Sequence, residues 1–193
     1  DRDVALEKAL NLFWQHGYEP TSLAMLCSEL GIRPPSFYAA FTSKEALFIE
    51  AIHHYDRKYW TKIFRQLEES NASLSAALTE FFERAVEVLV NPEHPRGCMV
   101  VIAATNLSAK EERIATLMKT LRRDTRAVFL RRLRRAQTEK EFRGDPETTA
   151  DALNIFLEGM SVQARDGISK NDLLKTVRLV PLLLTMPSTG LRQ

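Results

Sequence analysis

Cysteine is scarce in this 193-residue chain, and its only two copies, Cys27 and Cys98, lie far apart among apolar residues. This spacing fits neither a disulfide framework nor a zinc site, and it predicts a protein of a reducing compartment, the cytoplasm. Cys98 leaves two interpretations open. An accessible thiolate there would sense oxidants or electrophiles, whereas the neighbours Met99, Val100 and Val101 favour a buried, inert thiol.

The sequence also lacks the patterns on which membrane insertion and catalysis depend. No apolar run approaches the roughly 18 to 20 residues of a transmembrane helix, and no charged-then-apolar signal region opens the chain. The seven glycines form no phosphate-binding loop, and no nucleophile with its base, carboxylate pair or metal set stands out around the four histidines. His53 and His54 are adjacent, and consecutive helical side chains point about 100° apart, which disfavours a shared metal. We therefore expect no catalytic residues, no metal and no cofactor.

A strong charge of either sign is missing as well. The 27 basic and 25 acidic residues leave a net charge of +2, and residues 1–50 carry four lysines and arginines against seven aspartates and glutamates, a balance of −3. The arginines gather instead between residues 110 and 143. Charge alone would place nucleic acid on that segment. A solvated helix face whose arginines pair with acidic neighbours explains the same pattern, and we favour it.

Apolar residues recur at helical spacing along almost the whole chain, which predicts an all-α protein of about nine helices. The third expected helix begins with Pro34 and Pro35, which suit a first helical turn, and Gly31 supplies the turn before it. The last two expected helices carry apolar residues on more than one face, so we expect a second subunit to cover one of these faces. The expected helices span residues 3–16, 22–30, 34–41, 43–69, 74–90, 110–138, 146–165 and 170–186, with a short apolar segment at 98–106.

Residues 20–46 read PTSLAMLCSELGIRPPSFYAAFTSKEA, two short helices joined by a glycine turn and followed by a third helix start. This spacing is typical of a helix-turn-helix, whose exposed helix enters the major groove of DNA. Arg33 is the only long cationic side chain at that exposed side, so it is the candidate for reading bases. Contacts to phosphates, which position a protein without reading sequence, are expected from Thr21, Ser22, Tyr38 and Lys44. The complete predicted DNA-binding set is Thr21, Ser22, Arg33, Pro34, Pro35, Ser36, Tyr38 and Lys44.

The same region resembles the DNA-binding domain of the TetR (tetracycline-repressor-like) family. The resemblance covers about residues 5–50 and lies in LF..HGY..TS, the ELGI turn and SFYAAF.SKEALF. It implies a helix-turn-helix DNA-binding domain at residues 1–48, a helical ligand-binding and dimerisation domain at 49–193, and an Ω-shaped homodimer joined through the last two helices. Two departures imply fewer side-chain contacts to bases. Arg33 and its two prolines stand where many members have Ser-Lys-Gly, and Ala39 with Ala40 replaces a His-rich pair.

The resemblance also implies a ligand cavity in the larger C-terminal domain. Apolar side chains with a few polar groups would line it, so we expect a largely apolar small molecule, although each candidate alone also fits plain core packing. The candidates are Trp60, Phe64, Phe81, Met99, Asn106, Met118, Phe156, Met160 and Gln163.

Together these observations predict a ligand-responsive transcription regulator, a repressor that releases a palindromic double-stranded DNA operator when a small molecule binds. Two other classes of protein fit the sequence less well. A helical enzyme would need the catalytic groups that the sequence lacks. A scaffold that binds only protein would leave the exposed Arg33, Tyr38 and Lys44 after a turn unexplained.

Overall fold

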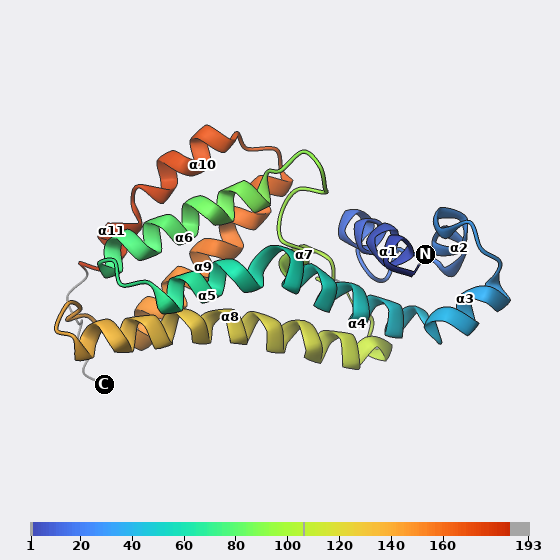
Figure 1. Ribbon diagram of the computed structural model, residues 1–193, viewed down its shortest axis with the longest axis horizontal. Coiled ribbons are helices and arrows are strands. Elements are labelled where there is room, and N and C mark those ends of the chain that lie inside the picture. The colour runs from blue at the N-terminus through green and yellow to red at the C-terminus, as the bar shows by residue number, and fades with distance from the viewer. Residues whose placement is uncertain (1, 106, 186–193) are drawn as a thin grey trace.

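The computed structural model describes residues 2–105 and 107–185, and all regular structure in these ranges is helical. It confirms the predicted all-α fold. Figure 1 shows an elongated molecule in which α1 (Arg2–His16), α2 (Leu23–Leu30) and α3 (Pro34–Phe41) form a small unit at one end, which we call the head. A long helical element then leads from the head into the body, where the remaining helices pack together.

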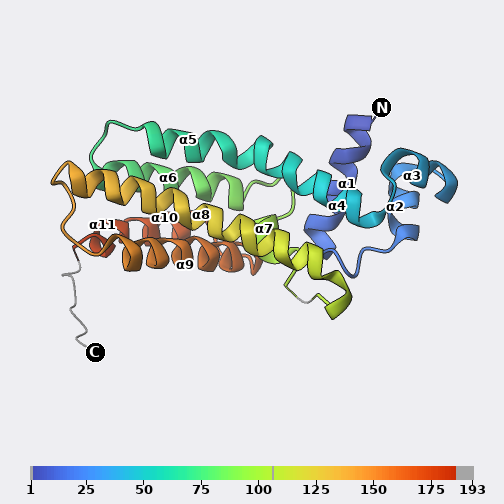
Figure 2. The same cartoon turned by 90° about the horizontal axis from the view of Figure 1, so that it is seen from below.

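The long element consists of α4 (Lys44–Tyr55), the π-helical turn η1 (Asp56–Trp60) and α5 (Thr61–Glu69). In the body, α8 (Glu112–Thr138) packs against α9 (Pro146–Arg165), and Figure 2 shows α9 along one long side of the molecule. The other elements of the body are α6 (Leu74–Leu89), α7 (Met99–Ile102), η2 (Ala109–Glu111), α10 (Lys170–Val177) and α11 (Val180–Leu183).

Side-chain caps mark five of the helix starts that the sequence predicts, whereas α3 and α8 begin without one. Ser43 accepts a hydrogen bond from the backbone of Ala46 at 2.9 Å, and this bond satisfies a donor that the first turn of α4 leaves without a helical partner. The same device begins four other helices, at Ser22, Ser73, Asp145 and Ser169. Local hydrogen-bonding chemistry thus explains why these boundaries were readable in advance.

Two expected helices differ from prediction. The helix predicted over residues 43–69 contains η1, where the backbone N–H of Thr61 bonds the carbonyl of Asp56, five residues back. Helical periodicity does not reveal one extra residue in a turn. The helix predicted over 170–186 is also broken, because Pro181 has no N–H to donate and its ring would clash with the carbonyl of Val177, so α10 ends there and α11 follows.

The segment of residues 97–103, which contains α7, ties the head to the body, and we call it the bridging segment. Its Gly97 carbonyl accepts a hydrogen bond from the Trp14 indole at 2.9 Å, and its Ala103 carbonyl accepts one from the Tyr18 backbone at 2.7 Å. On the body side, the Cys98 backbone donates to the Ser161 hydroxyl of α9 at 2.7 Å. A displacement of this segment would therefore change contacts in both the head and the body.

We expect Gly97→Ala to destabilise the fold by at least about 2 kcal/mol. Gly97 has a φ of 84°, which disfavours side chains, and an added Cβ would lie 2.9 Å from the Ser161 carbonyl oxygen. Gly167→Ala is the matched control, because Gly167 has a φ of 97° but nothing within 4 Å of its Cβ position. Its expected cost is about 1 kcal/mol. Chemical denaturation measures both, and equal losses would show that the contact with α9 is not tight.

Candidate nucleic-acid interface and ligand cavity

The short helix α3 has one buried and one exposed face. Phe37 and Phe41 are 0% and 4% exposed and hold α3 against the head, whereas Tyr38 between them is 53% exposed. The exposed face and the approach to it also carry Arg33, Pro34, Pro35 and Ser36, as predicted. Arg33 has no ion-pair partner among the described residues, so its guanidinium is available to an external acceptor.

The three other candidates for DNA contact, Thr21, Ser22 and Lys44, already make hydrogen bonds within the head. Thr21 is fully buried, and its hydroxyl donates to the Gly17 carbonyl at 2.6 Å. The Lys44 ammonium donates to the Tyr18 carbonyl at 3.1 Å and lies 4.3 Å from the centre of the Tyr18 ring. Ser22 is exposed and caps α2. Thr21 and Lys44 thus brace the turn between α1 and α2, and the free polar groups of the set are on the α3 side.

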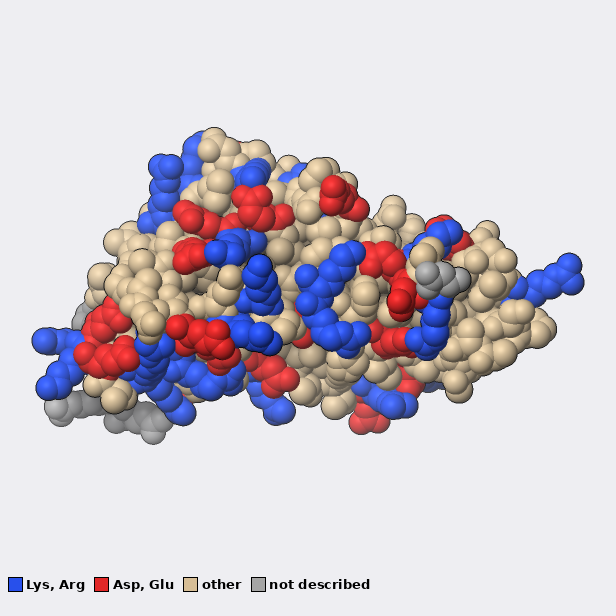
Figure 3. All heavy atoms as spheres, in the orientation of Figure 1, with Lys and Arg blue, Asp and Glu red and all other residues tan. Residues whose placement is uncertain are grey.

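The arginine-rich segment is α8, and carboxylates neutralise much of its charge. Arg126 pairs with Asp151 and Glu147, and Arg131 pairs with Glu68 at 2.5 Å. Arg134 and Arg135 also have acidic partners, Glu147 and Glu139. Figure 3 shows the two signs interspersed over the body. These pairs support the interpretation of the arginine-rich segment as a helix face neutralised by acidic neighbours, although Arg132 is buried.

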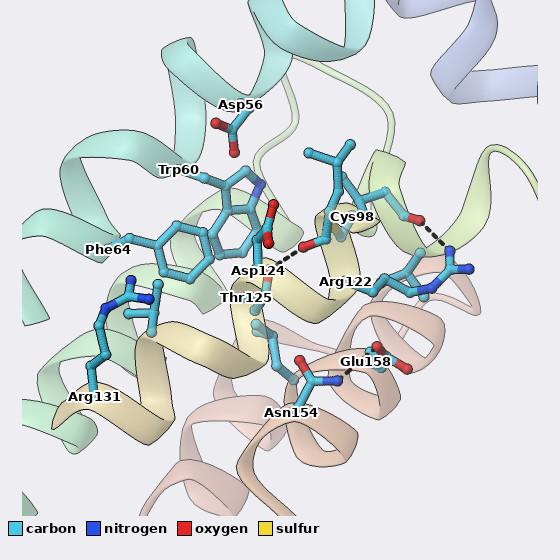
Figure 4. Close-up of a pocket in the computed structure, with 15 residues that line it drawn as sticks. Asp56, Trp60, Phe64, Cys98, Arg122, Asp124, Thr125, Arg131, Asn154 and Glu158 are labelled. Carbon is cyan, nitrogen blue, oxygen red and sulfur yellow. Dashed lines mark hydrogen bonds between the residues drawn. The ribbon is translucent and has the colours of Figure 1, made fainter. Parts of the chain in front are cut away.

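A cavity of about 300 Å³ lies in the body between η1, α5, the bridging segment, α8 and α9 (Figure 4). Its apolar wall includes Trp60, Phe64, Val100, Val101, Leu121 and Leu157. The rings of Trp60 and Phe64 stack with their centres 5.6 Å apart. This volume is at the lower end of the roughly 300–1,000 Å³ range of small-molecule sites.

Of the nine predicted ligand-binding residues, Trp60 and Phe64 line this cavity. Four others, Phe81, Met99, Met118 and Met160, are buried core residues that are not part of the lining. Phe156 is half-buried, Gln163 is exposed, and Asn106 lies outside the described residues. The structure therefore brings together only the aromatic pair of the predicted set.

Sequence reasoning missed the polar lining of the cavity. This lining consists of Asp56, Arg122, Asp124, Thr125, Arg131, Asn154 and Glu158. A signal did exist for Asp56, because it lies four residues after Ile52 and four before Trp60, on a helix stripe that is otherwise apolar. A carboxylate on such a stripe is a candidate for a functional role.

Cys98 also lines the cavity, but it is only 8% exposed. Burial raises the pKa of its thiol, although a hydrogen bond with Tyr55 acts in the opposite direction. Tyr55 further accepts a hydrogen bond from the Trp60 indole at 2.7 Å. Both cysteines are free and buried, as their apolar neighbours predict.

In the described part of the chain, His54 bonds Glu7 at 3.0 Å, and no group of three or more metal-binding side chains occurs.

Large apolar side chains face solvent on the last helices. Ile155 and Val162, seven residues apart on α9, are 68% and 45% exposed. Leu179 and Leu182, next to and within α11, are 54% and 60% exposed. An isolated chain gains nothing from such exposure, and clustered apolar side chains of this kind mark protein–protein contacts. They lie on the predicted dimerisation helices.

Comparisons with known proteins match both parts of the chain. A family model described as "Bacterial regulatory proteins, tetR family" matches residues 5–51, and one described as "Tetracyclin repressor-like, C-terminal domain" matches residues 75–170. The chain is 36% identical to the HTH-type transcriptional repressor ComR of Escherichia coli K12, over 95% of this chain and 90% of ComR. The repressor BdcR of the same organism is 27% identical over 92% of this chain and 85% of its own.

Solved structures agree with these matches. A cysteine mutant of the TetR family transcriptional regulator CifR, complexed with 26-bp double-strand operator DNA, superposes with a TM-score of 0.89 at 35% identity and covers 97% of each chain. NemR of E. coli in its reduced form shares the fold at a TM-score of 0.77, with 22% identity over 96% of this chain and 98% of its own. Within the described ranges, none of the helices combines the length and apolarity needed to cross a bilayer.

Proposed function

The chain belongs to the TetR family of bacterial regulatory proteins, and from this premise we propose how its residues serve a DNA-binding transcription regulator. The exposed face of α3 reads a palindromic operator, the homodimer presents this face twice, and a small molecule in the cavity releases the operator. The observation that carries this proposal is that the residues from Arg33 to Ser36 and Tyr38 are exposed, whereas Phe37 and Phe41 are buried beneath them.

The boundary between the two proposed domains lies within α4. Residues 1–48 form the DNA-binding domain, since Phe48 packs edge-on against Phe13 of α1, with the ring centres 5.1 Å apart. Residues 49–193 form the ligand-binding and dimerisation domain, since Tyr55 at the end of α4 accepts a hydrogen bond from the Met99 backbone in the body. We place the protein in the cytoplasm, where its target DNA lies and both cysteines stay free thiols.

The exposed surface of α3 suits close approach to a base-pair edge. Pro34, Pro35, Ser36, Ala39 and Ala40 are small or compact, so the helix backbone can come deep into a groove. Arginine at the start of such a helix can donate two hydrogen bonds to guanine, the commonest specific base contact. In a dimer, two such helices reach successive major grooves when their centres lie about 34–36 Å apart.

The bridging segment offers a route from the cavity to the head. Cys98, Val100 and Val101 line the cavity, and the two ends of the same segment bond Trp14 and Tyr18 of the head. A ligand bound more tightly in a conformation with another head spacing lowers DNA affinity by the same coupling free energy, typically about 1–3 kcal/mol. Release of the operator follows from this reciprocity.

We expect Arg33→Ala to weaken binding to the cognate operator by about 10- to 100-fold, because a bidentate base contact is worth about 1–3 kcal/mol. Binding to random DNA should fall much less. The comparison variant is Lys44→Ala, which should weaken both kinds of binding alike, because it removes the bond that braces the head at the Tyr18 carbonyl and no contact to a particular base. Gel-shift titrations with an operator selected from a random duplex library measure both ratios. Equal losses of selectivity in the two variants would contradict the assigned roles.

A further inference from the structure

Three carboxylates converge on the cavity from three different elements. Asp56 comes from η1, Asp124 from α8 and Glu158 from α9, and all three belong to its lining. Figure 4 shows Asp56 and Asp124 beside the Trp60 ring. Because the three residues are distant in sequence, their meeting is a property of the fold rather than of one charged helix face.

None of these carboxylates has a basic partner within 4.0 Å among the described residues. Asp56 accepts only a long hydrogen bond from the Thr61 hydroxyl, at 3.5 Å, and Glu158 accepts one from the Asn154 amide at 2.9 Å. The carbonyl oxygen of that Asn154 amide is buried and has no donor. The cavity therefore contains several acceptors without donors.

The arginines of the lining do not compensate for this charge. Arg131 already pairs with Glu68, outside the lining. Arg122 donates to the Val100 carbonyl at 3.1 Å and is the only lining cation without a carboxylate partner. Three carboxylates thus stand against one available guanidinium, and negative charge is in excess.

Burial makes this excess unfavourable at Asp56, whereas Asp124 is solvent-exposed. Burial raises the pKa of Asp56 and repulsion from Asp124 acts in the same direction, and together they outweigh the opposite effects of the Thr61 hydrogen bond and of the His53 and Arg57 charges. A buried carboxylate is stabilised when a positive charge comes close to it. The aromatic faces of Trp60 and Phe64 add a second attraction, since a cation near an aromatic ring is stabilised by the ring's quadrupole.

We propose that the cavity binds a small organic cation, an amine or quaternary ammonium carried on a flat apolar body. The positive charge lies by Asp56 and Asp124, and the body lies against Trp60, Phe64 and the aliphatic wall. This adds one charged group to the largely apolar ligand that the sequence predicts. The proposal rests on the proposed function in that the cavity is the regulatory ligand site.

The test uses probes of one shape and different charge. N-methylquinolinium is a flat cation, 1-methylnaphthalene is its neutral counterpart, and 1-naphthoate is an anion of similar size. Calorimetric titration of the purified full chain should give at least about tenfold tighter binding of N-methylquinolinium than of either other probe. Equal or tighter binding of the neutral probe or the anion would overturn the proposal.

Variants then locate the charge. Asp56→Asn and Asp124→Asn, which keep the side-chain shape, should each weaken N-methylquinolinium binding by about tenfold and leave 1-methylnaphthalene binding unchanged. Glu83→Gln is the matched control, because Glu83 is exposed on α6 and lies outside the cavity lining. Thermal unfolding of each variant identifies a folding defect, and either variant alone can carry the test. Unchanged cation affinity in both folded variants would overturn the proposal.

A measurement of operator release distinguishes failure of the cation site from failure of the proposed function. Gel shifts are repeated with each probe added to the protein–operator complex. Tight N-methylquinolinium binding without operator release would support the cation site and contradict the regulatory role of the cavity. Release by 1-methylnaphthalene or 1-naphthoate, but not by the cation, would support the regulatory role and overturn the cation site.

Discussion

Replacing Ile155 by arginine is expected to convert the dimer into monomers and to weaken operator binding by about 100-fold or more. Ile155 is the most exposed large apolar side chain on α9, one of the two helices through which we predict that the subunits join. In a twofold-symmetric dimer each subunit carries the substitution, so two unpaired charges would lie in an apolar interface. A monomer binds one half-site and loses the gain that the second, linked head provides.

Sedimentation of the variant measures its oligomeric state, and a gel shift with the selected operator measures its affinity. Thr138→Arg is the control, because it adds the same charge at an exposed position at the end of α8. It should remain dimeric with unchanged operator affinity. A dimeric Ile155→Arg protein would show that the subunits meet through another surface.

Phe37→Ala is expected to destabilise the head by about 3–5 kcal/mol and to abolish operator binding, because Phe37 is fully buried. Its ring contacts those of both Tyr38 and Phe41, so its loss leaves α3 without its main packing residue. The body should keep its helical structure and remain dimeric, since its core and its dimer face lie elsewhere. DNA binding would thus be lost with the dimer intact.

The neighbouring residue provides the comparison. Tyr38→Ala removes a side chain that is 53% exposed, so stability should change by less than about 1 kcal/mol while operator affinity falls. Denaturation curves and gel shifts on the two variants separate packing from DNA contact. If Tyr38→Ala lost stability but kept its affinity, the exposed face of α3 would have a structural role and not a reading role.

Much of the fold could be predicted because its signals are local. Ser22 and Asp145 cap helices through bonds to backbone groups two or three residues away, and the prolines of α3 stand where helix starts tolerate them. The exposed Ile155 and Val162 likewise followed from apolar residues that no single helix face could bury. The break before α11 was predictable in principle, since Pro181 cannot continue a helix.

The cavity could not be predicted in the same way, because it depends on distances between helices. Asp124 and Glu158 look like solvated helix charges in sequence, and only the packing of α8 on α9 makes them part of one cavity lining. The three methionines predicted for the cavity wall fill the core instead. In the DNA-binding domain, the structural role of Lys44 could not be predicted either, because its bond to the Tyr18 carbonyl arises from the fold of the head.

The most direct test of the account places a photo-crosslinking amino acid at Ala39, on the exposed face of α3, and irradiates the dimer on its selected operator. We predict two symmetric crosslinks to base edges, about 10 base pairs apart. The same group at Thr138 should give none. Absence of crosslinks from Ala39, or a single unpaired one, would contradict a reading helix presented twice by a symmetric dimer.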